Sequence, residues 1–205
     1  MFLNKLFILL IILLIIILSY IFLQKRDEVY YIEDFLSKED YDYIKNHVKN
    51  INDMKNERFR YIKPINDINI QRIFYSENII NKIQSIIDNK IMKSNFPIEY
   101  RIYPKGSEGM KCHKDTLLYD EPQYEMVYTI ENESDSYTNY FTYAGRNKKI
   151  YTKPNSLIIV KAQENMHCVS PVNKGYRSIL KLIYTQTDKY NNNYLNELKR
   201  FNSRF

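Results

Sequence analysis

From residue 97 onward the sequence breaks into short runs rich in Tyr, Ile, Val and Thr, and clusters of Gly, Pro, Asn and Ser separate these runs. Side chains of the first kind favour β-strands, and those of the second kind favour turns. The pattern predicts strands over residues 99–103, 110–115, 124–131, 137–143, 149–152, 156–161, 166–170 and 176–187. Strands at this spacing indicate a sandwich or jelly roll, so the expected fold class is mainly β with flanking helices.

Helices are expected on both sides of these strands. Ser37 and the acidic Asp40 form a helix start signal after a short strand over 30–35, and the helix should run to about residue 50. Another should follow Ser76, where isoleucines recur at helical spacing, and a last one should cover 190–201. A chain of 205 residues has room for one domain of ordinary size. We therefore expect one domain over 27–205, with a helical preface over 27–96 and a jelly-roll core over 97–187.

Residues 6–23 are apolar and contain no charged side chain. A helix of this length spans about 27 Å, near the thickness of a hydrocarbon core of about 30 Å. No small-x-small site follows the run, which argues against a cleaved signal peptide. The segment predicts an N-terminal transmembrane helix, with residues 1–26 as a membrane anchor. The expected localisation is single-pass membrane, with the endoplasmic reticulum and a lumenal catalytic domain as one option, although positive side chains on both flanks leave the orientation open.

Charge and cysteine content exclude some classes of protein. The net charge is +6, but lysines and arginines are scattered among acids and form no dense basic run, which argues against nucleic acid binding. Cys112 and Cys168 are the two cysteines. They are too few for a disulfide scaffold and lack the C-x-x-C spacing of a zinc ribbon.

Three residues in the β-rich half form a candidate metal site. On a strand, residues two apart face the same side, so His113 and Asp115 can point at one ion. His167 supplies a third ligand, and two imidazoles with one carboxylate leave coordination positions open, as expected of non-haem iron(II) oxygenases. A structural zinc ion would instead take four protein ligands. An H-x-D pair alone arises easily by chance. Isolated histidines on strands are also commonly half-buried and hydrogen-bonded to neighbours. The prediction of a metal site therefore depends on the sequence around His167.

The stretch HCVSPVNKGYR, from His167 to Arg177, places a Pro-Val turn, a glycine and a basic residue after the second histidine. The stretch YPKGSEGM, which begins at Tyr103, leads into His113. In these features residues 103–184 resemble the 2-oxoglutarate- and iron(II)-dependent dioxygenases, specifically the prolyl 4-hydroxylase-like branch. The resemblance implies a jelly roll that holds Fe(II) at His113, Asp115 and His167, with 2-oxoglutarate as co-substrate and ascorbate as an accessory reductant.

The resemblance also assigns roles around the metal. Arg177 is expected to pair with the far carboxylate of 2-oxoglutarate, and Tyr103 is expected to contact the same molecule. Strand parity leaves Thr129 or Tyr128 as a further contact, and we select Thr129. Two positions depart from the family pattern, because Met110 stands where relatives often have tyrosine and Ile179 where they often have serine or threonine.

The function implied is hydroxylation of a protein side chain, prolyl or other, with decarboxylation of 2-oxoglutarate to succinate. The expected partners are a protein or peptide substrate and, through the N-terminal helix, a membrane. A nucleic acid demethylase of the same superfamily is disfavoured, because those carry a second arginine six residues after the first and Ile183 stands there. Two alternatives are a catalytically silent, membrane-tethered binding module and an oxygenase with a non-protein substrate. In the silent module, Arg177 would be a surface ion-pair partner and Tyr103 a residue of the hydrophobic core.

Each cysteine neighbours one of the candidate histidines. In an antiparallel strand pair, the position numbers of facing residues have a constant sum. If His113 faces His167, then Cys112 faces Cys168 on the other side of the same sheet. This predicts that the two sulfurs lie close together, and both a disulfide and two buried thiols are compatible with that arrangement.

Overall fold

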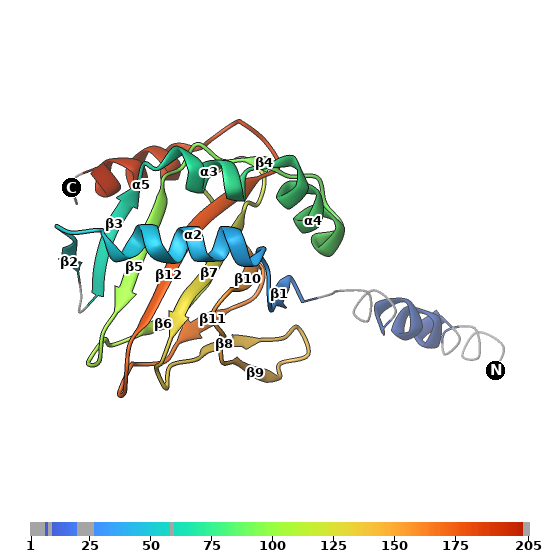
Figure 1. Cartoon of the computed structure of the whole chain (residues 1–205). Coiled ribbons are helices and arrows are strands. Elements are labelled where there is room, and N and C mark those ends of the chain that lie inside the picture. The colour runs from blue at the N-terminus through green and yellow to red at the C-terminus, as the bar shows by residue number, and fades with distance from the viewer. Residues whose placement is uncertain (1–6, 8–9, 20–26, 58–59, 203–205) are drawn as a thin grey trace.

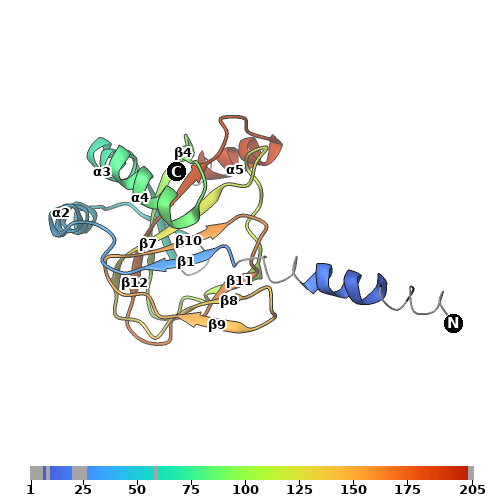
Figure 2. The ribbon, with the colours of Figure 1, turned by 90° about the vertical axis from the view of Figure 1, so that its right-hand side faces the viewer.

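The computed structural model describes residues 7, 10–19, 27–57 and 60–202, and within them two antiparallel sheets lie opposite each other (Figures 1 and 2). The larger sheet runs in the order β1 (Val29–Ile32), β10 (Ser156–Lys161), β7 (Tyr124–Asn132), β12 (Arg177–Thr185), β5 (Ile98–Tyr103), β3 (Arg60–Ile65) and β2 (Lys55–Glu57), and β4 (Met92–Lys93) also pairs with β12. The smaller sheet runs in the order β6 (Met110–His113), β11 (His167–Val169), β8 (Thr138–Phe141) and β9 (Asn147–Ile150). Every strand predicted from residue 97 onward is present, which confirms the mainly β jelly roll.

The described helices after the N-terminal segment are α2 (Lys38–Lys49), α3 (Ile68–Phe74), α4 (Glu77–Ile87) and α5 (Asn192–Asn202). The predicted cap at Ser37 is confirmed, because its side chain accepts from the Asp40 backbone N–H. The predicted helix start after Ser76 is also present, and there the Ser76 side chain accepts from the backbone N–H of Ile79. Residues 27–96 also contain the β2–β3 hairpin, β4 and α3, none of which the sequence pattern indicated.

The larger sheet has two chemically different faces. Tyr124, Met126 and Tyr128 of β7 are buried in one core cluster together with apolar side chains of α2, α3 and α4. Side chains alternate along a strand, so Glu125, Val127 and Thr129 face the other way, toward the smaller sheet. The helices therefore cover one face, and the space between the sheets is left for the site.

The predicted membrane anchor over residues 1–26 is corrected by the structure. Among the described residues, no helix is long and apolar enough to cross a membrane, which contradicts the expected transmembrane helix and the single-pass membrane localisation. Of the predicted span, residues 6, 8–9 and 20–23 lie outside the described residues.

Candidate metal centre

The three predicted ligands meet between the two sheets. His113 ends β6 and pairs directly with His167, the first residue of β11, while Asp115 follows β6. One ligand atom from each residue lies within 4.8 Å of the others. The carboxylate spans the pair, with Oδ1 3.6 Å from His113 Nε2 and Oδ2 3.4 Å from His167 Nε2. No other group of His, Cys, Asp and Glu with this geometry occurs among the described residues.

Backbone contacts set which ring nitrogen of each histidine is available. His113 Nδ1 lies 2.8 Å from the Lys111 carbonyl oxygen, and His167 Nδ1 lies 3.2 Å from that of Asn165. A carbonyl oxygen only accepts, so in each neutral ring Nδ1 carries the proton and Nε2 keeps its lone pair. The two Nε2 atoms are those that lie beside Asp115, and both are therefore suited to bind a metal.

The Asp115 carboxylate has the charge that a metal ligand needs. Burial acts to raise its pKa, but when the imidazoles are protonated the hydrogen bond from His113, together with the charges of Lys181 and His167, outweighs this and holds the pKa below its usual value. Oδ2 is buried and accepts no hydrogen bond from the described residues. A buried carboxylate oxygen without a donor is costly, and a bound cation offsets that cost. Two imidazoles and one carboxylate, with no fourth ligand grouped with them in the described part of the chain, fit iron(II) better than structural zinc.

Cys112 and Cys168 form a disulfide on the outer side of the same two strands, with their Cα atoms 4.2 Å apart. The predicted proximity is confirmed, and of the two states left open the bonded one is present. Each cysteine is bonded through the backbone to a ligand histidine, so the disulfide fastens together the strands that position His113 and His167.

Replacing both cysteines with serine is expected to lower the free energy of unfolding by about 2–4 kcal/mol, because the unfolded chain loses a long covalent loop. The bonded residues are 56 positions apart. Urea denaturation of the oxidised wild type and of the Cys112→Ser/Cys168→Ser variant measures the difference, and wild type in reductant serves as a control that should match the variant. Equal stability of all three samples would show that the bond does not clamp the strands.

The turn that leads into β6 passes very close to the end of β11. Gly109 has a φ of +76°, and a Cβ added there would lie 2.3 Å from the Val169 carbonyl oxygen and 2.7 Å from Ser170 backbone atoms. Only glycine permits this approach, which keeps the two ligand-bearing strands in register.

Gly109→Ala is therefore expected to destabilise the fold more than Gly145→Ala. Gly145 has a similar φ of +72°, but its added Cβ meets no atom within 4 Å. Left-handed strain alone costs about 1–2 kcal/mol, and overpacking at position 109 should add about 1–3 kcal/mol. Denaturant melts of the two variants give this difference directly, and equal destabilisation would rule out a steric role for Gly109.

Arg177, at the start of β12, lies in the interior beside the triad. It is 3% exposed, pairs with Tyr103 of β5, and its guanidinium carbon lies 5.6 Å from the centre of the Tyr103 ring. Its Nε and Nη1 find no hydrogen-bond partner among the described residues. Burial, together with the charge of Arg101, lowers the pKa of Arg177. A buried guanidinium with unpaired N–H groups suits a carboxylate, and the far carboxylate of 2-oxoglutarate fits this requirement.

An inner pocket of about 90 Å³ joins Arg177 to the three ligands. Tyr103, Met110 and Ile179 line it, so both departures from the family pattern face the pocket as apolar side chains. Thr129 pairs with Ile179, and its hydroxyl is buried without a hydrogen-bond partner among the described residues. It does not line this pocket, so its contact with a co-substrate stays a prediction.

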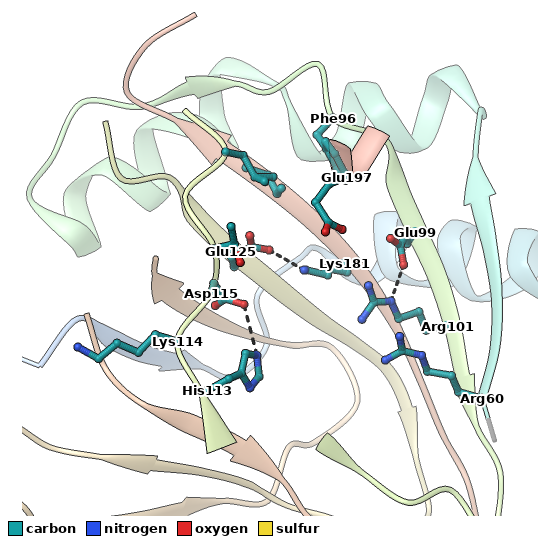
Figure 3. A pocket seen from close by; sticks show the side chains of 13 residues that line it. Arg60, Phe96, Glu99, Arg101, His113, Lys114, Asp115, Glu125, Lys181 and Glu197 are labelled. Atoms are coloured by element: carbon teal, nitrogen blue, oxygen red, sulfur yellow. Dashed lines mark hydrogen bonds and ion pairs between the residues drawn. The ribbon is translucent and has the colours of Figure 1, made fainter. Parts of the chain in front are cut away.

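A group of charged side chains on the inner face of the larger sheet was not among the predicted site residues, and Figure 3 shows it around one pocket. Arg101 Nε donates to Glu99 at 2.6 Å, and Lys181 Nζ lies 2.9 Å from a Glu125 carboxylate oxygen. The sequence could have indicated three of them, because residues two apart on a strand face the same side. Glu99 and Arg101 therefore face as Tyr103 does, and Lys181 faces as Arg177 does. A fifth member, Arg60, lies on β3, in the hairpin that the pattern did not indicate.

Comparisons with known proteins give a match in structure. No family model and no curated protein matches the sequence. A 2OG-Fe(II) oxygenase family protein from Burkholderia pseudomallei superposes with a TM-score of 0.69 at 9% identity, over 79% of this chain and 86% of that one. A prolyl hydroxylase from Trichoplax adhaerens gives 0.62 at 16% identity (78% and 84%), and a Pseudomonas putida prolyl-4-hydroxylase gives 0.59 at 15% (78% and 94%).

The chain therefore has the fold of the 2-oxoglutarate- and iron(II)-dependent oxygenases, as the sequence resemblance predicted. Prolyl hydroxylases are among the solved structures that share this fold. At these identities the likeness concerns the fold, so the chemistry has to be argued from the site itself.

Proposed function

We propose that this protein is an iron(II)- and 2-oxoglutarate-dependent dioxygenase that hydroxylates a side chain of a protein substrate, in the manner of prolyl 4-hydroxylases. The observation that carries the proposal is the position of Arg177, a buried cation with unpaired N–H groups, in the same pocket as a two-histidine, one-carboxylate triad. A catalytically silent binding module has no use for a buried, unpaired charge, which costs folding energy.

The proposal assigns a role to each residue of the site. His113, Asp115 and His167 would hold the iron, with Nε2 of each histidine and the carboxylate as ligands. Arg177 would bind and orient 2-oxoglutarate through its far carboxylate, and the Tyr103 ring beside the guanidinium would restrict its position. Bound iron(II) with 2-oxoglutarate supplies the oxidative chemistry, in which succinate and carbon dioxide are released and one oxygen atom enters a C–H bond of the substrate.

The wall opposite the metal ligands keeps water away from the pocket. Val127, Ile158 and Val160 come from adjacent strands, line the inner pocket and carry no polar side-chain atoms. An apolar wall strengthens the electrostatic interactions of Arg177 and Asp115 with their ligands. Ascorbate is expected to sustain turnover as an external reductant.

Two open grooves beside the metal site support the proposal that the substrate is a polypeptide. One of about 460 Å³ and another of about 220 Å³ both reach His113, so a chain can pass the metal site and continue on the other side. The Trichoplax adhaerens prolyl hydroxylase was solved with a peptide fragment of hypoxia inducible factor. By analogy, we place a peptide segment across the two grooves of this protein.

The test is incubation of the full-length protein with iron(II), 2-oxoglutarate, ascorbate and a proteome extract, followed by mass spectrometry of the peptides. We expect one added oxygen atom on specific side chains, and none with the Asp115→Asn variant. If succinate forms but no protein gains an oxygen atom, the protein substrate is wrong while the oxygenase stands.

A further inference from the structure

The two grooves meet at a cluster of positive charge beside the metal site. Both are lined by Arg60, Arg101 and Lys181 as well as by His113. Lys181 is paired with Glu125, so its charge is locally balanced. Arg101 is likewise paired with Glu99, whereas the contact between Arg60 and Glu57 is longer, at 3.4 Å.

Arg60 and Arg101 stand on neighbouring strands and face the same way. Tyr61 of β3 pairs with Ile102 of β5, so the side chains on either side of this pair, Arg60 and Arg101 among them, lie on the inner face. Figure 3 shows the two guanidinium groups next to each other, directed into the pocket toward His113.

The acids near these arginines leave donors for a further anion. Glu99 accepts from Nε of Arg101, at the base of its guanidinium. Arg60 contacts Glu57 at a long 3.4 Å, and its Nε is buried with no hydrogen-bond partner among the described residues. Unsatisfied buried donors are rare and costly, and two like charges side by side repel. An anion shared by the two guanidinium groups removes both costs.

The positive charges of Arg60 and Arg101 also act on Tyr103, which lines the inner pocket. Tyr103 is buried, which acts to raise its pKa, yet the charges of Arg101, Arg60 and Arg177 together lower it below the usual value. Of these three arginines, Arg60 and Arg101 line the grooves, so their positive charge also acts on an occupant of the grooves.

The two grooves differ in charge. The larger one is lined by Arg60, Arg101, Lys111 and Lys181 against a single acid, Glu108. The smaller one, which extends past Phe96 and Glu197 of the α5 side, has as many acids as bases among its lining residues. An acidic segment is thus favoured in the larger groove only.

We propose that the primary substrate is a polypeptide segment with an aspartate or glutamate close to the hydroxylated residue, and that this carboxylate binds between Arg60 and Arg101. The assignment rests on the proposed function, because it takes the site beside the triad to be the place where substrate reacts. It makes the two arginines the specificity determinants on one side of the metal, while Arg177 serves the co-substrate.

The test measures peptide binding directly by fluorescence anisotropy. Full-length protein is loaded with Mn(II) and N-oxalylglycine and titrated with labelled pools of proline-centred peptides that carry Asp, Asn or Lys in the flanking positions. We expect the Asp pool to bind about tenfold or more tightly than the Asn pool, as for a charge-assisted hydrogen bond. Arg60→Gln should remove most of this preference, and Arg60→Glu should turn it toward the Lys pool. Arg146→Gln, at an exposed position after β8, is the matched control and should leave it unchanged.

Equal binding of the three pools, or an Asp preference that survives in Arg60→Gln and Arg60→Glu, overturns the inference. Circular dichroism of each variant confirms that the fold is kept. Succinate formation from 2-oxoglutarate without any peptide, measured on the same samples, reports on the proposed function separately. Active protein with no acid preference contradicts the specificity alone, and inactive protein that still prefers the Asp pool contradicts the oxygenase alone.

Discussion

Replacing His167 with alanine is expected to abolish metal binding and to reduce 2-oxoglutarate turnover about a thousandfold or more, equivalent to roughly 4 kcal/mol. His167 is 8% exposed and supplies one of two imidazoles that lie against Asp115, so its loss leaves too few ligands to hold an ion. Calorimetric titration with Fe(II) under anaerobic conditions measures affinity, and succinate formation measures turnover.

The third histidine of the chain provides the control. His47 lies on α2, contacts Asp67 and stacks on Tyr43, away from the triad. His47→Ala should bind Fe(II) as the wild type does. The isosteric Asp115→Asn variant guards against loss of function through misfolding, because it keeps the shape of the site and removes the charge. Undiminished Fe(II) affinity in folded His167→Ala or Asp115→Asn would show that the three residues are not the ligands.

Loss of the Arg177 guanidinium is expected to raise the KM for 2-oxoglutarate roughly a hundredfold, because a buried charge-assisted pair is removed. Arg177→Gln tests the charge, and Arg177→Lys keeps the charge but loses the planar fork, so it should fall between Arg177→Gln and wild type. Fe(II) affinity should be unchanged in both, since Arg177 contributes no ligand atom. The readout is succinate formation at graded 2-oxoglutarate concentrations.

Loss of the Arg177 charge, which is expected to weaken co-substrate binding, is expected to stabilise the ligand-free fold. Without co-substrate, Arg177 is a buried cation with unpaired N–H groups. Arg177→Met is therefore expected to raise the free energy of unfolding of the ligand-free protein by about 1–4 kcal/mol. Urea denaturation in the absence and presence of 2-oxoglutarate and Mn(II) measures this, and 2-oxoglutarate should stabilise only the wild type. A strong destabilisation of ligand-free Arg177→Met would instead assign Arg177 a structural role.

The jelly-roll core and the triad could be predicted because each depends on local pattern. Alternation of side chains along a strand put His113 and Asp115 on one face, and the closeness of the two cysteines followed from the assumption that His113 faces His167, a pairing that the structure contains. The Pro-Val turn before Arg177 and its spacing from His167 placed the guanidinium in the interior.

What could not be predicted depends on contacts between distant segments. β3 has the sequence RYIKPI, whose proline disfavours a strand, and it forms one because it adds to the edge of β5. Arg60 reaches the site only through that pairing, and no sequence pattern connects it to Arg101. The N-terminal prediction rested on hydropathy alone, and among the described residues no helix is long and apolar enough to cross a membrane.

The most direct measurement is the conversion of labelled 2-oxoglutarate to succinate by purified full-length protein, with and without Fe(II), beside Asp115→Asn. If His113, Asp115 and His167 hold iron and Arg177 holds the co-substrate, succinate and carbon dioxide form in equal amounts, only with Fe(II), and not with the variant. Folded protein that binds neither Fe(II) nor 2-oxoglutarate and forms no succinate would contradict the assignment of this site as an oxygenase centre.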